Sequence, residues 1–76
     1  MYDQNKVSIV TSELSKLALT GIGLEGSGDE TSLDEAIPVP LAQRLCARLQ
    51  KLDMEASWAP DHDDAELAWV YVRVDA

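Results

Sequence analysis

The chain has 76 residues, of which 14 are acidic and 6 are basic, so its formal charge is -8 with the one histidine neutral. This length allows one small domain over residues 1–76 and excludes multi-domain enzymes. The charge argues against direct binding to nucleic acid, which needs a basic stripe, and against docking on an anionic membrane.

The N-terminal segment favours a helix over residues 4–20. Asp3 is a suitable N-cap, and Gly21 would end the helix. Apolar residues recur between them at helical spacing, namely Val7, Val10, Leu14, Leu17 and Ala18. Strands at 6–13 and 17–24 remain the alternative, because Ile9 and Leu19 lie off this stripe and Val7 to Thr11 is rich in β-branched residues.

Residues 25–37 are predicted to form a flexible, solvated acidic loop. Gly26, Ser27 and Gly28 favour flexibility, and the only apolar residues of the segment are Leu33, Ala36 and Ile37. The glycines at 21, 23 and 26 match the GxGxxG pattern of dinucleotide-binding proteins. No helix-forming sequence follows them and the chain is too short for a doubly wound sheet, so we expect a connector and no cofactor.

The clearest predicted element is an amphipathic helix over residues 40–52. Pro40 suits its first turn. Its apolar arc contains Leu41, Ala42, Leu45, Cys46, Leu49 and Leu52. Arg44, Arg48 and Lys51 form a basic edge, which could simply pair with the neighbouring acidic loops.

A C-terminal antiparallel β-hairpin is predicted, with strands at about 54–59 and 66–74. Alternation divides the second strand into a valine face and a face with Leu67, Trp69, Tyr71 and Arg73. Pairing of Ala59 with Glu66 would place Met54, Ala56 and Trp58 beside the aromatic face, whereas a one-residue slip would place them beside the valines. The predicted fold class is therefore α+β.

No motif of the chain indicates catalysis or metal binding. Asp61, His62, Asp63, Asp64 and Glu66 cluster oxygen ligands, but an EF-hand starting at Asp61 would need glycine and glutamate where Glu66 and Val72 stand. Cys46 lies on the apolar arc of a helix, where cysteine is usually a core residue, and no pattern supplies it with a base. We therefore predict that the protein is not an enzyme and holds no metal.

The single cysteine also precludes an internal disulfide. The chain shows no apolar run of the length that a signal peptide or a membrane span needs. We therefore expect a cytoplasmic protein.

The acids are concentrated in two blocks that contain no basic residue. Eleven of the fourteen lie there: Glu25, Asp29, Glu30, Asp34 and Glu35 in the first block, and Asp53, Glu55, Asp61, Asp63, Asp64 and Glu66 in the second. Such segregation favours a protein-binding module whose carboxylates dock on a basic surface of another protein. The residues predicted to make this contact are Asp29, Glu30, Asp34, Glu35, Asp61, Asp63, Asp64, Glu66, Trp69 and Tyr71.

The sharpest version of this prediction is an inhibitor that mimics nucleic acid. Small acidic phage inhibitors, anti-CRISPR proteins among them, share the size and charge of the chain, but no family motif is present. The alternative is a structural or regulatory subunit that buries Leu67, Trp69 and Tyr71 against a partner or, as a homodimer, against a second copy.

Overall fold

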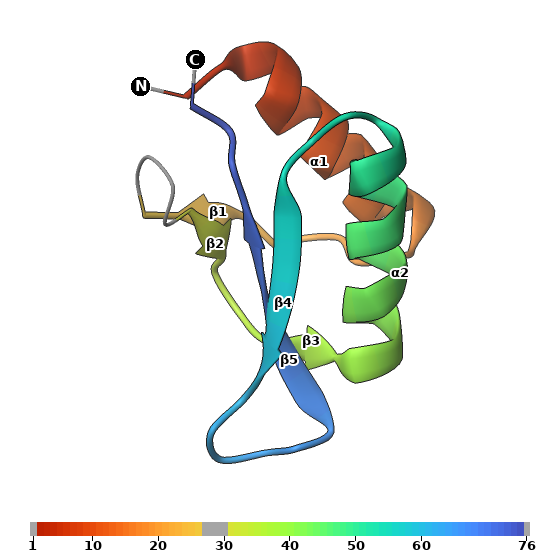
Figure 1. Cartoon of the computed structure of the whole chain (residues 1–76), viewed down its shortest axis with the longest axis vertical. Coiled ribbons are helices and arrows are strands. Elements are labelled where there is room, and N and C mark those ends of the chain that lie inside the picture. The colour runs from red at the N-terminus through yellow and green to blue at the C-terminus, as the bar shows by residue number, and fades with distance from the viewer. Residues whose placement is uncertain (1, 27–30, 76) are drawn as a thin grey trace.

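Two helices pack against one face of a five-stranded antiparallel sheet, as the computed structural model of the chain shows for residues 2–26 and 31–75 (Figure 1). The elements in chain order are α1 (Gln4–Lys16), β1 (Leu24–Glu25), β2 (Ser32–Leu33), β3 (Ile37–Pro38), α2 (Val39–Lys51), β4 (Ala56–Pro60) and β5 (Leu67–Val72). The predicted α+β class is confirmed. Within the described ranges, neither helix has the length and apolar character needed to cross a bilayer.

Strand β5 is the centre of the sheet. On one edge it pairs with β4, and on the other it pairs first with β3 and then with β2, to which β1 is added. Ile37 lies opposite Ala68, and Ser32 lies opposite Tyr71, so the two short strands share the same edge of β5. The amide of Val72 continues this edge by donating to the carbonyl of Thr31 at 2.9 Å.

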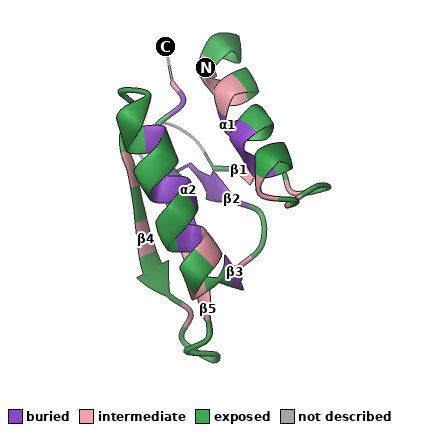
Figure 2. Cartoon of the chain, turned by 90° about the vertical axis from the view of Figure 1, so that its right-hand side faces the viewer, coloured by how far each residue is buried: buried purple, intermediate pink, exposed green. Residues whose placement is uncertain are grey.

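The core lies between the helices and the valine face of the sheet. Ala68, Val70, Val72 and Val74 are all buried, as alternation along β5 predicts. The helices contribute a buried set made of Val10, Leu14, Ala42, Leu45, Cys46 and Leu49 (Figure 2). The predicted apolar arc of α2 is thus the face that packs on the sheet, although Leu52 at its end remains exposed.

The hairpin adopts the register that places its first strand beside the valines. Trp58 lies opposite Val70, and Ala56 lies opposite Val72. Ala59 pairs with Trp69 rather than with Glu66, because the Asp-rich segment forms the loop that joins the two strands. Trp58 therefore packs its half-buried side chain against the core.

Residues 4–16 are helical, as predicted, and strands at 6–13 are excluded. Asp3 caps the helix by accepting a hydrogen bond from the Asn5 amide at 2.9 Å. The predicted end at Gly21 is wrong, since the helix is already closed at Leu17. Leu19 donates from its amide to the Leu14 carbonyl at 2.8 Å, which is the long bond of a Schellman motif.

Each helix ends in a Schellman motif, and in both motifs the residue in the left-handed region is not glycine. Ala18 has a φ of 61° after α1, and Asp53 has a φ of 66° after α2. In α2 the Met54 amide donates to the Leu49 carbonyl at 3.1 Å. A left-handed conformation costs roughly 1–2 kcal/mol for a residue with a Cβ atom. These closures are held by their hydrogen bonds and by the apolar side chains around them.

The predicted acidic loop over residues 25–37 differs from the structure. It contains the second residue of β1, all of β2 and the first residue of β3, and its residues Thr31, Ser32 and Leu33 are buried. Pairing with β5 explains why this polar segment can be buried, because its backbone groups form hydrogen bonds within the sheet. Residues 27–30 lie outside the described part of the chain.

A buried carboxylate joins the two helices. Glu13 is only 4% exposed, and its Oε1 accepts from Arg48 Nε at 2.5 Å while its Oε2 lies 3.0 Å from Lys16 Nζ. Hydrogen bonds from Lys16 and then from Arg48 lower the pKa of Glu13 from its ordinary value of 4.5. The basic edge of α2 is thus used in part to neutralise an acid of α1.

The two ends of the described chain are also tied together. Tyr2 and Asp75 form an isolated antiparallel bridge, and the Asp3 amide donates to the Val74 carbonyl at 2.6 Å. The Tyr2 hydroxyl donates to the Gly26 carbonyl at 2.6 Å. The residues before α1 therefore contact both the end of the described chain and Gly26, which follows β1.

We predict that Ala18→Gly stabilises the protein by about 0.5–1 kcal/mol, because it relieves left-handed strain at a modest entropic cost in the unfolded chain. Urea unfolding of the two proteins measures the change. Ala47→Gly, at an exposed interior position of α2, is the matched control and should destabilise by about 1 kcal/mol. A loss of stability in Ala18→Gly would contradict the assigned closure.

Acid should weaken the protein partly through Glu13. Since the pKa of Glu13 is lower in the folded state, its contribution to the free energy of unfolding is complete above the ordinary value of 4.5. This contribution is lost as the pH falls through the folded pKa. Glu13→Gln should therefore be less stable near neutral pH and should lose less stability on acidification than the wild type. Urea titrations across this pH window measure both effects, with Glu25→Gln, an exposed carboxylate of β1, as control.

Candidate interaction surface

The sheet face opposite the helices carries the aromatic residues of β5. Leu67 and Trp69 are half-buried, and Tyr71 is 39% exposed. On the neighbouring strand Ala59 lies opposite Trp69 and Ser57 lies opposite Tyr71. These small side chains cannot cover the rings beside them. We call this surface, made of Ser57, Ala59, Leu67, Trp69 and Tyr71, the open face.

An acid of the hairpin turn fixes the position of Trp69. The indole Nε1 donates to Oδ2 of Asp61 at 3.1 Å, while Oδ1 of the same carboxylate accepts from the Asp63 amide at 2.8 Å. The hydrogen bond from the Asp63 amide, followed by that from Trp69, lowers the pKa of Asp61. Trp69 is therefore held in place on the open face by a charged partner.

The other acids of the turn divide between structural and exposed roles. Oδ1 of Asp64 accepts from the Glu66 amide at 2.9 Å, and the Asp64 carbonyl accepts from the Leu67 amide at 3.1 Å. Asp63 and Glu66 are exposed, as is His62, which precedes Asp63. The Asp-rich composition thus serves the turn itself, because aspartate side chains readily accept from nearby backbone amides.

Of the first acidic block, Asp34 and Glu35 lie in the connection between β2 and β3. These two strands pair with opposite ends of β5, and Figure 1 shows the connection passing alongside the central strand toward β3. The Asp34 carboxylate folds against Gly23, where an added Cβ would lie only 3.1 Å from Oδ2. Asp29 and Glu30, also predicted to make the contact, lie outside the described residues.

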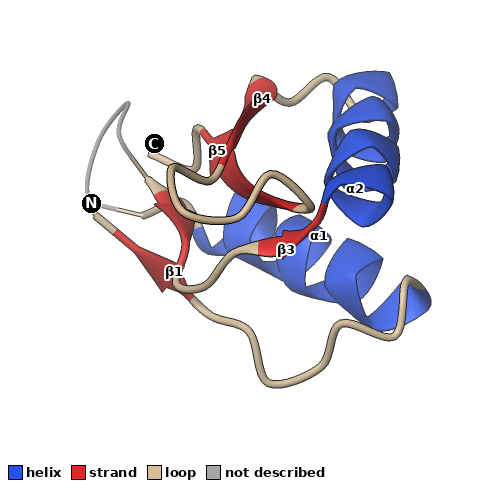
Figure 3. Ribbon diagram, turned by 90° about the horizontal axis from the view of Figure 1, so that it is seen from below, coloured by secondary structure: helices blue, strands red, loops and turns tan. Residues whose placement is uncertain are grey.

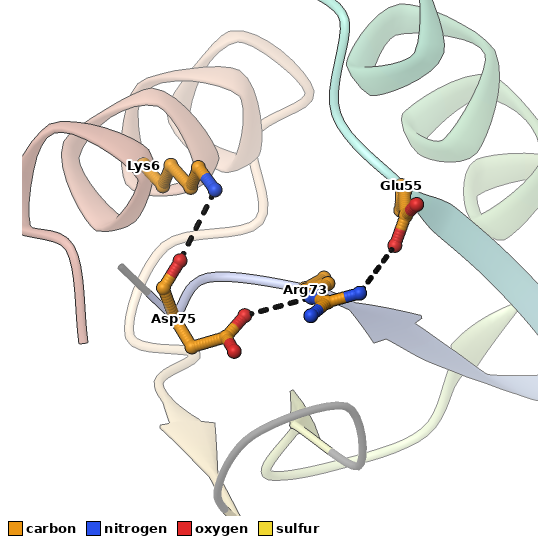
Figure 4. Close-up of polar contacts among 4 residues, drawn as sticks. All are labelled: Lys6, Glu55, Arg73 and Asp75. Carbon is orange, nitrogen blue, oxygen red and sulfur yellow. Dashed lines mark hydrogen bonds and ion pairs between the residues drawn. The ribbon is translucent and has the colours of Figure 1, made fainter. Parts of the chain in front are cut away.

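The second block does not form one surface. Asp53 and Glu55 precede β4, whereas Asp61 to Glu66 follow it, at a separation of about 17 Å for a five-residue strand. Glu55 lies 3.4 Å from Arg73 Nη1, and Nε of Arg73 donates to Asp75 at 3.0 Å (Figure 4). Lys6 of α1 also donates to the Asp75 carbonyl at 3.1 Å. Glu55 and Arg73 thus belong to a cluster that joins the end of the chain to α1 and β4.

Arg73 also explains the titration of its neighbour. Its hydrogen bond is the main cause of the lowered pKa of Asp75. In the sequence Arg73 shares the alternation of Trp69 and Tyr71. Its guanidinium forms ion pairs with Glu55 and Asp75.

Sequence reasoning missed Ser57 and Ala59, which lie on the open face. Nothing in their residue types signals a binding surface, and only the register of β4 against β5 identifies what their small size leaves uncovered. The glycines of the GxGxxG pattern lie in the connection from α1 through β1. Gly21 and Gly26 have positive φ angles, as expected of turn residues.

The described residues offer few candidates for a metal site or a reactive side chain. Among residues 2–26 and 31–75, no three His, Cys, Asp or Glu side chains are arranged to hold a metal ion. Cys46 is buried, and burial raises the pKa of its thiol. Comparison of the chain with protein-family models, with curated protein sequences and with solved structures finds no match.

Trp69 should report the titration of Asp61. In a Trp58→Phe variant Trp69 is the only tryptophan, and its fluorescence should change as acid protonates its partner. The midpoint should lie below 3.8, the ordinary pKa of aspartate, because the charged form accepts both hydrogen bonds. Asp61→Asn should abolish this transition, and an unchanged transition in that variant would contradict the assigned contact.

Proposed function

We propose that the protein is a non-enzymatic binding module that docks its open face, with the acids around it, on a basic surface of another protein. The observation that supports this most is the division of charge between the helices and the rest of the chain. The helices contain five basic residues and one acid, Glu13, for a formal charge of +4. The rest of the chain contains thirteen acids and Arg73, for a formal charge of -12.

This separation of charge gives the molecule an electric dipole, so it orients in the field of a charged partner. A basic partner attracts the acidic segments and repels the helices, which lie on the other side of the sheet from the open face, so long-range attraction favours approach with the open face forward. Such steering raises the rate of association and is screened by salt within about 10 Å at 0.1 M ionic strength. The proposed contact therefore depends on orientation as well as on net charge.

The aromatic residues supply the short-range part of the contact. Tyr71 and Trp69 offer large, stiff, amphipathic side chains, which are enriched among residues that dominate binding energies. Asp61 restrains Trp69 before binding, which reduces the entropy that the indole would lose in a complex. The acids at the margin supply charge around an apolar centre, as in many protein interfaces.

Mimicry of nucleic acid is the most specific form of the proposal. Asp34 and Glu35 lie in the connection that follows one side of β5, and Asp61, Asp63 and Glu66 precede it. In this proposal their carboxylates border two sides of the open face. A surface that binds phosphates presents cations with which such carboxylates can pair. The partner would then be a nucleic-acid-binding protein, and the module would act as its inhibitor.

A homodimer through the open face is the second candidate, favoured by the exposure of Tyr71. Such a dimer would bring two acidic margins together, and like charges oppose this. We therefore favour a basic partner. Sedimentation distinguishes the candidates, because self-association through the open face should strengthen as salt screens the repulsion, whereas binding to a basic partner should weaken.

The experiment removes charge without changing shape. Asp34→Asn/Glu35→Gln and Asp63→Asn/Glu66→Gln each neutralise two exposed acids. Each should slow association with a partner purified from the native host by about three- to tenfold at low salt, and the loss should shrink at high salt. Surface plasmon resonance over a range of salt concentrations measures both rates.

The matched control changes the charge equally on the other layer. Ser8→Lys/Thr11→Lys adds two positive charges to exposed positions of α1. It should slow association less than either acid variant, because it lies on the layer that faces away from the partner. Equal effects of the control and the acid variants would mean that net charge alone governs binding, and salt-independent binding would contradict the electrostatic proposal.

A further inference from the structure

The outer edge of β4 presents backbone groups that β5 does not use. Among the described strands β4 pairs with β5 alone. The bonds from the Arg73 amide to the Glu55 carbonyl at 3.0 Å and from the Asp61 amide to the Leu67 carbonyl at 2.9 Å show that odd-numbered residues face β5. Because antiparallel pairing alternates, the amides and carbonyls of Ala56 and Trp58 are directed to the outer edge.

A groove runs between this edge and α2. Its volume is about 370 Å³, and one wall is formed by Gln43, Cys46, Ala47 and Gln50, which recur at helical spacing on α2. Ala56, Ser57 and Trp58 form the other wall. Figure 3, which views the molecule from below, shows β4 beside α2 with β5 on its other side. The groove thus combines a strand edge with a helix wall.

The chain itself already makes one of the contacts that an added strand would make. Nε2 of Gln50 donates to the outward carbonyl of Ala56 at 3.0 Å. Gln50 is exposed, so its side chain can turn away when a backbone amide takes its place. At the far end Pro60 has no amide hydrogen, which limits the edge to the two residues Ala56 and Trp58 as donors.

The charges around the edge of β4 indicate which kind of segment can bind there. The walls of the groove contain no charged residue, whereas acids stand at both ends of β4, with Glu55 before it and Asp61, Asp63 and Asp64 after it. A second copy paired antiparallel about Trp58 would place Glu55 opposite Asp61 of its partner. Like charges opposite each other destabilise a strand pair. An occupant with cations at its ends would meet opposite charges instead.

We propose that the edge of β4 binds an extended segment of a partner protein, with small or apolar residues at its centre and Lys or Arg at its ends, as an added strand of the sheet. The backbone of Trp58 and the amide of Ala56 supply its hydrogen bonds, and the α2 wall receives alternate side chains. The inference rests on the proposed function only for the positive charge of the partner, since the open face and the groove beside this edge share only Ser57.

The test uses synthetic peptides of about seven residues with lysine at both ends and alternating valine and threonine between them. Two-dimensional amide NMR of the whole chain should show shifts confined to β4 and to residues 43–50, with protection of the Trp58 amide from exchange. Ala56→Pro removes an outward donor and leaves the bonds to β5 in place, so it should weaken binding at least tenfold, roughly the value of one to two backbone hydrogen bonds.

A second variant acts from the helix. Ala47→Arg adds a cation to the groove wall and should also weaken the lysine-ended peptide, whereas Thr11→Arg, an exposed control on α1, should leave its affinity unchanged. Amide spectra of each variant establish that it is folded. Peptides with glutamate at both ends should bind more weakly to the wild type.

The outcomes separate this inference from the proposed function. Binding without shifts at β4, shifts at Leu67, Trp69 and Tyr71 instead, equal affinity in Ala56→Pro, or no binding by any peptide would each overturn the edge proposal. Concentration-dependent self-association that Ala56→Pro abolishes would also overturn it, in favour of a second copy. A partner that still binds in a salt-dependent manner would in every such case leave the proposed function standing.

Discussion

The position of β5 at the centre of the sheet is the constraint on which the rest of the structure depends. Strands β2, β3 and β4 all pair with it, and β1 joins through β2. Its buried side chains form the floor of the core, while its opposite side chains form the open face. Because side chains alternate along a strand, a slip of one residue would exchange the interior with the surface. The hydrogen bonds of the Asp61–Glu66 turn and of Glu55 with Arg73 hold the register from both ends.

The elements that the sequence predicts well are those whose residues repeat. The leucines of α2 and the valines of β5 specify one helix face and one strand face, and both faces follow from the spacing of these residues in the sequence. Strands β1, β2 and β3 have two residues each, too few for alternation to be seen. Ser32 pairs with Tyr71, a residue far along the chain, so the burial of this polar segment follows from tertiary contacts.

Helix boundaries were harder to predict because the usual signal is absent. A glycine generally occupies the left-handed position that closes a helix, and Gly21 was the first one available. The chain instead uses Ala18 and Asp53 there, with apolar residues beside both closures. The local preference for glycine at these positions is therefore outweighed by the packing of residues such as Leu14 and Met54, which are buried in the core.

Part of the candidate site could be predicted from the acidic composition of the chain, and part of it could not. Segregated charge is visible in the sequence, but its division between basic helices and an acidic remainder of the chain follows only from the helix boundaries. Some acids chosen as contacts, among them Asp61 and Asp64, bond within the turn, so they shape the surface as well as charging it. Ser57 and Ala59 mattered through their smallness, which carries no chemical signature.

The bridge between Tyr2 and Asp75 has a consequence for how this domain can be connected to others. Both ends of the described chain lie together, at the opposite end of the molecule from the hairpin turn (Figure 1). A host protein could therefore accept the whole domain as an insertion in one surface loop, with entry and exit side by side. Joining the two ends and opening the chain at another exposed connection would give a circular permutant with the same sheet.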